Sequence, residues 1–382
     1  MKQLCGLVLV LIMVFGVLPM PARAADLEIG GKSALLMELS TGKILYEKNA
    51  HEALAPASVT KVMTMLLIME AIDSGSIGWN DTVTASDAAA AKGGSQIYLK
   101  VGESMTVSDM VKSIAVSSAN DCACAMAEHL AGSEAAFVER MNQRAKELGM
   151  NDTHFVNCTG LDDDPNAKEH VTSAHDIALM SRELMLHHPE IRKFTTIWMD
   201  TVRNGEFGLS NTNKLVRFYP GATGLKTGFT SAAGYCLSAT AQRDGMELVA
   251  VVMGCETSQE RFAACKSMLD YGFATYAVVN PTLEESVSVP VVLGKQEKVN
   301  AVPGQASPVL IEKAQKGSIT TTVTLEKQIP APVSKGQRLG TFTVRSGDQI
   351  LAQIPLIAET AVKKKTFADL FIEILKMAAM AK

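Results

Sequence analysis

The chain has 382 residues, of which 47% are hydrophobic and 20% are charged, a composition typical of a globular protein with two or three domains. Its formal net charge is −4, and the body of the chain carries no block of Lys or Arg. This charge pattern argues against nucleic acid as the main partner.

The first 24 residues have the features of an export signal. Lys2 gives a positive start, the apolar run Leu7–Val17 is short for a membrane span, and Ala22-Arg23-Ala24 offers small residues for cleavage. We therefore expect cleavage near Ala24 and a mature protein that works outside the cytoplasm.

Six cysteines remain after that cleavage, namely Cys122, Cys124, Cys158, Cys236, Cys255 and Cys265. An even number in an exported protein suggests disulfides, but a chain this long has a core that folds without them. Most of these residues lie in apolar segments, where a free cysteine packs as a small hydrophobic side chain. We favour free thiols and keep disulfides as the alternative.

The first predicted elements are two strands, Ser33–Leu39 and Lys43–Glu47, joined by a tight turn. Ser40 and Lys43 are three residues apart, a spacing that recurs below in a motif with chemical potential. On a hairpin turn the two side chains are not stacked, so we expect this pair to be a solvated loop.

From Pro56 to Glu70 the pattern changes to that of a helix with apolar residues on nearly all sides, which is typical of a buried helix. Ser58 lies in its first turn and Lys61 one turn later, so both side chains point the same way. A serine needs a base to act as a nucleophile, and a lysine can be that base where burial and a neighbouring cation favour its neutral form. A chemical role for the pair therefore calls for a second cation, a polar relay and an anion site.

Helices are predicted next over Met105–His129, Ser133–Leu148 and Ser173–His187. Ser118 and Asn120 flank a helix start in this region. Ser118 could pass protons between Lys61 and a leaving amine, while the Asn120 amide could bind a substrate peptide group and hold Lys61. The alternative is that both residues only cap a helix.

Strands are predicted over Tyr235–Thr240 and Glu247–Met253, followed by a helix over Gln259–Tyr271. Before them, the run Lys226-Thr227-Gly228 opens a strand. Lys226 and Thr227 would offer a cation and a hydroxyl to a carboxylate, and Gly228 would let a substrate backbone lie against the strand. An ordinary strand start is the alternative.

Strands at both ends of a helical middle predict an α/β (α+β) domain over 25–280, with one mixed sheet and a helical cluster. Short β-branched runs separated by Gly and Pro predict a small all-β domain over 283–360, which we expect to be structural. The histidines form no His-Glu-x-x-His motif, and His170 and His175 are five residues apart. We expect no metal and no cofactor.

The tail, 363–382, is predicted to be an amphipathic helix on a membrane surface. Its apolar face carries Phe367, Leu370, Phe371, Ile374, Leu375 and Ala378, and three lysines precede it. The alternative is a helix that docks on its own protein.

Ser58-x-x-Lys61, Ser118-x-Asn120 and Lys226-Thr227-Gly228, in this order, form the signature of penicillin-recognising serine acyltransferases. Within that group the chain resembles the low-molecular-weight penicillin-binding proteins that are D-Ala-D-Ala carboxypeptidases. The resemblance runs from about Leu27 to Tyr276 and continues into the β domain and the tail. Its further landmarks are Gly160-Leu161-Asp162, Thr172-Ser173-Ala174 and Ala233-Gly234-Tyr235.

This resemblance implies a penicillin-binding, transpeptidase-like fold and a role for each motif. It gives Ser58 as the acylated nucleophile, Lys61 as its base, Ser118 as the proton relay, Asn120 as the substrate-amide binder, and Lys226 and Thr227 as the carboxylate site. The backbone N–H groups of Ser58 and Phe229 would form the oxyanion hole. By its spacing from Lys226, Arg261 falls where the family keeps an arginine near the carboxylate site.

The function that the resemblance implies is removal of the terminal D-alanine from peptidoglycan pentapeptides through an acyl-Ser58 intermediate. Its expected partners are stem peptides that end in D-Ala-D-Ala, β-lactams as covalent inhibitors, and a membrane surface. The expected location is the outer face of the cytoplasmic membrane or the cell wall. A β-lactamase and a penicillin-binding module without turnover stay open as alternatives. Glu147 faintly resembles the deacylating glutamate of class A β-lactamases, but we expect it at a helix end.

Overall fold

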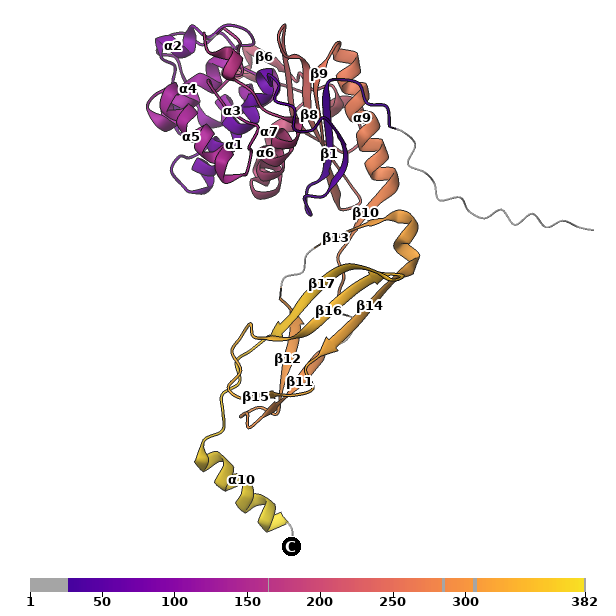
Figure 1. Ribbon diagram of the computed structural model, residues 1–382. Coiled ribbons are helices and arrows are strands. Elements are labelled where there is room, and N and C mark those ends of the chain that lie inside the picture. Colours follow the sequence, from indigo (N-terminus) through magenta and orange to yellow (C-terminus); the bar gives the residue numbers. More distant parts are fainter. Residues whose placement is uncertain (1–26, 164, 284–285, 305–307, 381–382) are drawn as a thin grey trace, which may run out of the picture.

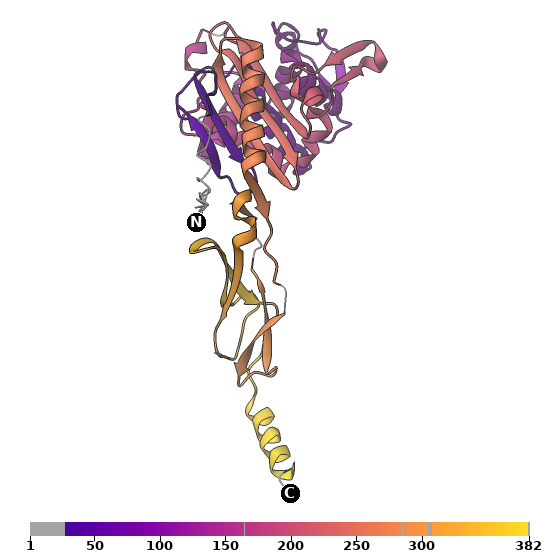
Figure 2. The ribbon, with the colours of Figure 1, turned by 90° about the vertical axis from the view of Figure 1, so that its right-hand side faces the viewer.

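The computed structural model describes residues 27–163, 165–283, 286–304 and 308–380. The expected export signal, 1–24, lies outside the described residues. Figures 1 and 2 show a head built of helices and a sheet, a narrower β-rich part below it, and a helix at the far end.

Within the described residues, the head contains a five-stranded sheet of order β2-β1-β9-β8-β7. Its strands are β1 (Ser33–Glu38), β2 (Ile44–Lys48), β7 (Ala222–Thr230), β8 (Gly234–Arg243) and β9 (Met246–Cys255). The N- and C-terminal strands therefore meet in one sheet, as predicted. The expectation of a mixed sheet was wrong, because every pairing in this sheet is antiparallel. Tight turns join β1 to β2, β7 to β8 and β8 to β9, and such hairpins impose antiparallel neighbours.

The β1–β2 hairpin confirms that the first serine–lysine pair is structural. Ser40 Oγ donates to Glu38 Oε1 at 2.7 Å within the turn, and Lys43 is exposed.

Helices cover both faces of this sheet. On one face lies α9 (Ser258–Thr275), and the helical cluster covers the other (Figures 1 and 2). The cluster contains η1 (Ala57–Thr60), α1 (Lys61–Asp73), α2 (Asp87–Ala90), α3 (Val107–Ser117), α4 (Asn120–Ala131), α5 (Glu134–Glu147), η2 (Ala167–Glu169), α6 (Ala174–His187), η3 (Pro189–Ile191), α7 (Arg192–Thr195) and η4 (Arg203–Gly205). Two small hairpins accompany it, β3 (Thr82–Thr84) with β4 (Ser104–Thr106) and β5 (Met199–Val202) with β6 (Phe207–Ser210). The short helix α8 (Leu215–Phe218) instead contributes Leu215 to the core beneath α9.

The burial of β1 shows how the head is layered. Leu35 and Met37 pack in the core shared with the helical cluster, whereas Ala34 and Leu36 pack in the core beneath α9. Because side chains alternate across a strand, a strand between two apolar layers is buried at every position.

The helix predicted over Met105–His129 is two helices, so that prediction was wrong. Ser118 adopts a left-handed backbone conformation (φ +63°), which ends α3 at Ser117 and lets α4 begin at Asn120. The apolar pattern runs on across this break, so hydrophobic periodicity alone predicts one helix, whereas the helix start expected at Ser118 and Asn120 is confirmed. The other predicted helices, α1, α5, α6 and α9, are confirmed.

The second part of the chain is β-rich, as predicted. One pair consists of β10 (Tyr276–Val279) and β13 (Val309–Glu312). Among the residues that the structure covers, a further sheet has the order β14-β16-β17-β12-β11-β15. It is built from β11 (Val287–Val292), β12 (Lys298–Pro303), β14 (Ile319–Leu325), β15 (Ile329–Pro330), β16 (Arg338–Ser346) and β17 (Gln349–Ala358), with η5 (Lys313–Ser318) before β14.

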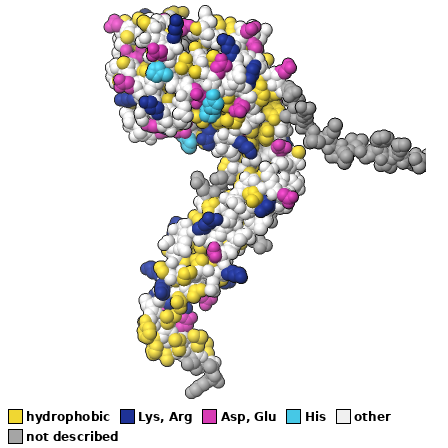
Figure 3. All heavy atoms as spheres, viewed as in Figure 1, with side chains coloured by type: hydrophobic (Ala, Val, Ile, Leu, Met, Phe, Trp, Pro, Cys, Tyr) yellow, Lys and Arg dark blue, Asp and Glu magenta, His cyan; other side chains and the backbone are white. Residues whose placement is uncertain are grey.

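The C-terminal helix α10 (Phe367–Met380) confirms the helical prediction for the tail. Its side chains Phe367, Phe371, Ile374 and Leu375 are exposed, and hydrophobic side chains gather at this end of the molecule (Figure 3). The polar side of α10 faces the protein instead, since Asp369 pairs with Lys295 at 3.0 Å. In the part of the chain that can be described, the helices are all too short or too polar to cross a membrane.

Candidate active site

Ser58 and Lys61 stand at the start of the buried helix α1. Ser58 lies in η1 and Lys61 is the first residue of α1. Lys61 Nζ is 2.9 Å from Ser58 Oγ and donates to the carbonyl oxygen of Thr159 at 2.7 Å. Ser58 is half-buried, whereas Lys61 is fully buried. The predicted pair is therefore in hydrogen-bond contact at the start of a buried helix.

Burial changes the acid–base chemistry of Lys61. Desolvation lowers its pKa from 10.5 to about 7, although the nearby Cys158 and Asp121 favour the charged form. A sizeable fraction of the amine is therefore neutral near pH 7. A neutral amine at 2.9 Å can accept the hydroxyl proton of Ser58.

The turn that carries Ser58, residues 56–60, is called the serine turn here, and two glycines pack closely against it. A Cβ on Gly160 would lie 1.8 Å from the carbonyl oxygen of Ala57, and a Cβ on Gly228 would lie 2.6 Å from that of Pro56. Both positions must lack a side chain for these segments to approach the turn. We had expected Gly228 to make room for substrate; the structure gives its contact with the turn as the reason for a glycine.

Ser118 and Asn120 lie at the junction of α3 and α4, and neither side chain caps a helix. The residue before α4 is Ala119, without a side-chain cap, and Asn120 Nδ2 donates to the carbonyl oxygen of Gly93 at 2.7 Å. Ser118 Oγ and Asn120 Oδ1 are buried, and neither has a hydrogen-bond partner within the described residues. Buried polar atoms normally have partners, so both oxygens are candidates to bind substrate or water.

Lys226 and Thr227 lie on β7, which is an edge strand of the five-stranded sheet. They lie in the middle of this strand, whereas the sequence predicted them at its start. Lys226 Nζ is buried and donates to the carbonyl oxygen of Thr227 at 2.9 Å. Thr227 Oγ1 donates to Thr212 Oγ1 at 2.6 Å. Burial lowers the pKa of Lys226 well below its ordinary value, and the charges of Lys61 and Arg261 lower it further.

Lys226 lies close enough to be affected by the charge of Lys61, but that a neighbouring cation lowers the pKa of Lys61 stays a prediction, because burial is the cause that lowers it. Repulsion between the two amines lowers the pKa of Lys226. An arriving carboxylate would restore the charge on Lys226, because an opposite charge favours the protonated form.

Arg261 reaches the same strand from α9. Its Nη1 donates to the carbonyl oxygens of Gly228 at 2.9 Å and of Cys236 at 3.4 Å. The guanidinium thus joins β7 to β8 beside the position of Lys226. Phe229 follows on β7 with a half-exposed ring that stacks on Tyr235 at 4.2 Å between centroids.

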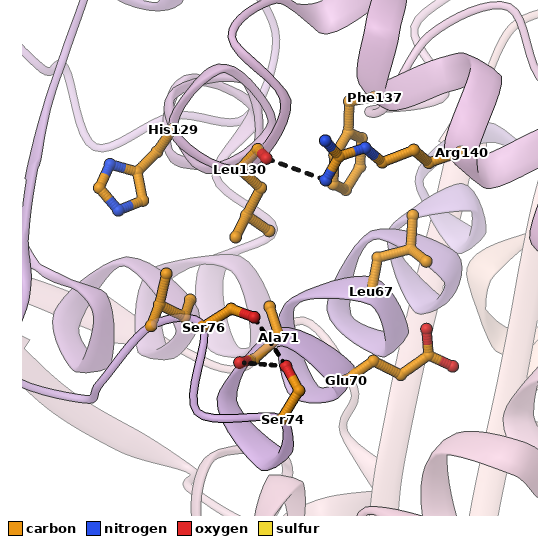
Figure 4. A pocket seen from close by; sticks show the side chains of 10 residues that line it. Leu67, Glu70, Ala71, Ser74, Ser76, His129, Leu130, Phe137 and Arg140 are labelled. Atoms are coloured by element: carbon orange, nitrogen blue, oxygen red, sulfur yellow. Dashed lines mark hydrogen bonds between the residues drawn. The ribbon is translucent and has the colours of Figure 1, made fainter.

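The cavity drawn in Figure 4 lies at the other end of α1. It has a volume of about 390 Å³ and is lined by residues such as Leu67, Ser74 and Arg140. A 13-residue helix is about 20 Å long, so this cavity is remote from Ser58.

A group that could bind a cation lies near the same end of α1. Glu70, Glu183 and His188 have ligand atoms within 4.8 Å of one another. Arg144 already donates to Glu70 and Glu183 at 2.7 Å each. These two ion pairs balance the charges of both carboxylates, so their closeness to each other does not call for a metal.

The sequence motifs missed the backbone carbonyls that orient the site. The carbonyl oxygen of Thr159 accepts from Lys61, and that of Gly93 accepts from Asn120. The motifs also missed the hydroxyl of Thr212, which accepts from Thr227. The run Gly160-Leu161-Asp162 was noted as a landmark, but no side-chain chemistry pointed to the carbonyl just before it. All six cysteines of the described part are buried and free.

Comparison with known protein families gives two matches. The model of the D-alanyl-D-alanine carboxypeptidase family matches residues 20–257. The model of the penicillin-binding protein 5 C-terminal domain matches residues 282–364.

Similar curated proteins cover nearly the whole chain. D-alanyl-D-alanine carboxypeptidase DacF of Bacillus subtilis is 44% identical over 352 residues, which are 90% of this chain and 89% of that protein. D-alanyl-D-alanine carboxypeptidase DacA of Escherichia coli is 32% identical over 363 residues, which are 92% of this chain and 88% of that protein.

Solved structures show the same architecture. Penicillin binding protein 5 from Haemophilus influenzae superposes with a TM-score of 0.77 at 29% identity, covering 88% of this chain and 98% of that one. Penicillin-Binding Protein D2 from Listeria monocytogenes, in its ampicillin-bound form, gives a TM-score of 0.60 at 32% identity. That match covers 65% of this chain and 100% of the other.

Proposed function

Since the chain belongs to the D-alanyl-D-alanine carboxypeptidase family of serine peptidases, we propose that it removes the terminal D-alanine from peptidoglycan pentapeptides through an acyl-Ser58 intermediate. The observation that carries this assignment is the 2.9 Å contact between Ser58 Oγ and the buried amine of Lys61. Burial keeps that amine neutral for part of the time, so it can act as a base at neutral pH.

Substrate binding uses two sides of the site. Lys226 and Thr227 bind the terminal carboxylate, and the charge of the carboxylate raises the pKa of Lys226 again. The Asn120 amide binds a peptide group of the substrate. Its Nδ2 is already fixed by Gly93, so the unpartnered Oδ1 is the atom that can accept from a substrate N–H.

The chemistry then proceeds in two halves. Lys61 takes the proton of Ser58, and Oγ attacks the carbonyl carbon of the penultimate D-alanine. Backbone N–H groups of Ser58 and Phe229 stabilise the resulting oxyanion. Ser118 relays the proton from Lys61 to the leaving amine, which frees D-alanine, and water then hydrolyses the acyl ester. A β-lactam acylates Ser58 in the same way, because its ring amide takes the place of the scissile peptide bond.

The β-lactamase alternative has little support from Glu147. This residue ends α5, and its carboxylate pairs with Arg144 at 3.4 Å. We therefore propose slow hydrolysis of the penicilloyl ester.

Export and attachment to a membrane surface complete the proposal. The segment 1–24 would direct export, 25–280 would be the catalytic domain, 283–360 the structural β domain, and 363–382 a surface anchor. Support for the anchor comes from α10, whose apolar side chains are exposed while Asp369 faces Lys295. A helix that docked on its own protein would bury the apolar face instead.

One experiment separates the candidate functions. The full chain is incubated with a D-Ala-D-Ala-terminated peptide and, separately, with penicillin. Rapid release of D-alanine with a slowly decaying acyl-enzyme supports the carboxypeptidase. Fast penicillin turnover would identify a β-lactamase, and a stable adduct without D-alanine release a binding module. Ser58→Ala should abolish labelling, and the matched variant Ser40→Ala on the β1–β2 turn should keep it.

A further inference from the structure

Two backbone carbonyls orient two of the proposed active-site residues. The carbonyl oxygen of Thr159 accepts from Lys61 Nζ at 2.7 Å, and that of Gly93 accepts from Asn120 Nδ2 at 2.7 Å. Their two loops lie far apart in the sequence. The position of each carbonyl depends on what holds its own loop.

A single carboxylate, that of Glu134 in the first turn of α5, contacts the residue that precedes each carbonyl. Its Oε2 lies 2.7 Å from Lys92 Nζ, and Lys92 directly precedes Gly93. Its Oε1 accepts from the backbone N–H of Cys158 at 3.2 Å and from the thiol of Cys158 at 3.1 Å. Cys158 directly precedes Thr159, so Glu134 ties both loops to α5.

The charge state of Glu134 suits this role. Burial raises its pKa, but hydrogen bonds from Lys92 and Cys158 outweigh burial and keep the pKa below its ordinary value. The carboxylate is therefore ionised at neutral pH. The side chains of Glu134 and Lys92 are 22% and 23% exposed, so the pair is better shielded from solvent than an ordinary surface ion pair.

We propose that Glu134 is a positioning residue for the carboxypeptidase reaction, which holds the loops whose carbonyls orient Lys61 and Asn120. This inference rests on the roles proposed above for Lys61 and Asn120. Glu134 does not touch the substrate or Ser58. It acts by keeping the Lys61 amine against the hydroxyl of Ser58 and the Asn120 amide at the substrate.

The test is Glu134→Gln in the full chain. Glutamine keeps an acceptor for the Cys158 N–H but presents a neutral amide to Lys92, so the ion pair is lost. A displacement of about 1 Å at a reacting group can cost about a hundredfold in rate. Because glutamine can still accept from the Cys158 N–H, the loop of Thr159 stays attached to α5. We therefore expect a smaller effect, about a tenfold fall in the acylation rate with penicillin and in kcat/KM for D-alanine release.

Glu183→Gln is the matched control. The Glu183 side chain is 20% exposed, and its carboxylate pairs with Arg144 at 2.7 Å, so it resembles Glu134 in burial and pairing. It makes no contact with either loop and should change acylation less than about twofold. All rates are measured below the Tm of every variant. If Glu134→Gln acylates as fast as Glu183→Gln, the proposal is wrong.

A double variant separates positioning from simple stability. Lys92→Met with Glu134→Gln removes both charges, so Tm should recover towards that of the wild type because no buried charge is left unpaired. Acylation should stay slow, since the tie to the Gly93 loop is still missing. Recovery of acylation together with Tm would overturn the positioning role. If Glu134→Gln alone does not fold, Lys92→Met and the double variant decide by the same criteria.

Failure of this inference is distinct from failure of the proposed function. A wild-type chain that releases no D-alanine and is not labelled at Ser58 contradicts the proposed function. A wild type that does both, with Glu134→Gln equal to its control, contradicts only the role of Glu134.

Discussion

Replacing Gly160 by alanine should displace the serine turn. A Cβ at this position would lie 1.8 Å from the carbonyl oxygen of Ala57, whereas real Cβ atoms essentially never come within 3.0 Å of such an atom. One of the two segments must therefore move by more than about 1 Å. Ala57 directly precedes Ser58, so this movement reaches the nucleophile, and a displacement of that size can cost about a hundredfold in rate.

Gly149→Ala is the matched control for the backbone. Gly160 and Gly149 have φ values of +79° and +74°, so the left-handed backbone conformation costs alanine a similar amount, roughly 1–2 kcal/mol, at either position. At Gly149 the new Cβ would meet nothing within 4 Å. The difference between the two variants therefore isolates the contact with Ala57.

The assay is the rate of acylation by penicillin, with Tm measured in parallel. We expect Gly160→Ala to acylate at least about tenfold more slowly than Gly149→Ala and to melt at a lower temperature. Equal acylation rates in two folded variants would show that a Cβ at position 160 does not displace Ser58.

Further predictions concern the two lysines and the tail. Burial lowers the pKa of Lys61 to about 7, so its neutral fraction, and with it the acylation rate, should rise about tenfold between pH 6 and pH 8; a flat profile over this range would argue against Lys61 as the base. Lys226→Met should lower kcat/KM for D-Ala-D-Ala peptides by about 10- to 100-fold through the loss of a charged hydrogen bond to the carboxylate, and an unchanged kcat/KM would place the carboxylate elsewhere. A chain that ends before Lys363 should release D-alanine as before but no longer sediment with anionic vesicles. Phe371→Asp with Ile374→Asp in the full chain should weaken sedimentation in the same way, and truncation that leaves it unchanged but lowers Tm by several degrees would show that the helix stabilises its own protein.

The part of the site that lies on one helix could be predicted from the sequence. Ser58 and Lys61 are one turn apart in an apolar helix, and this local pattern determines both their contact and the burial of the amine. Nothing local identified Thr159 as the partner of Lys61, because the two residues are 98 positions apart and meet only in the folded chain. The same holds for Glu134, which lies in no motif.

Local backbone geometry accounts for the other errors. The helix break at Ser118 leaves no mark in the apolar pattern, since hydrophobic residues continue on both sides of it, and only the polar residues Ser118 and Asn120 indicated a helix start there. Gly228 could be recognised as a position of close approach, but its partner, the turn at Pro56, comes from a distant segment. The direction of the strands is determined by the tight turns between them, which impose antiparallel pairing, whereas the order of strands and helices along the chain is compatible with a mixed sheet.

The most direct test of Ser58 as the acylated nucleophile is to locate the covalent adduct. The protein is mixed briefly with penicillin, digested and analysed by peptide mass spectrometry, and a parallel sample is assayed for release of D-alanine from a D-Ala-D-Ala peptide. We expect one penicilloyl group on Ser58, together with D-alanine release that is lost when this adduct forms. An adduct on another serine, such as Ser40 or Ser118, or D-alanine release that persists in the fully acylated protein, would contradict this role of Ser58.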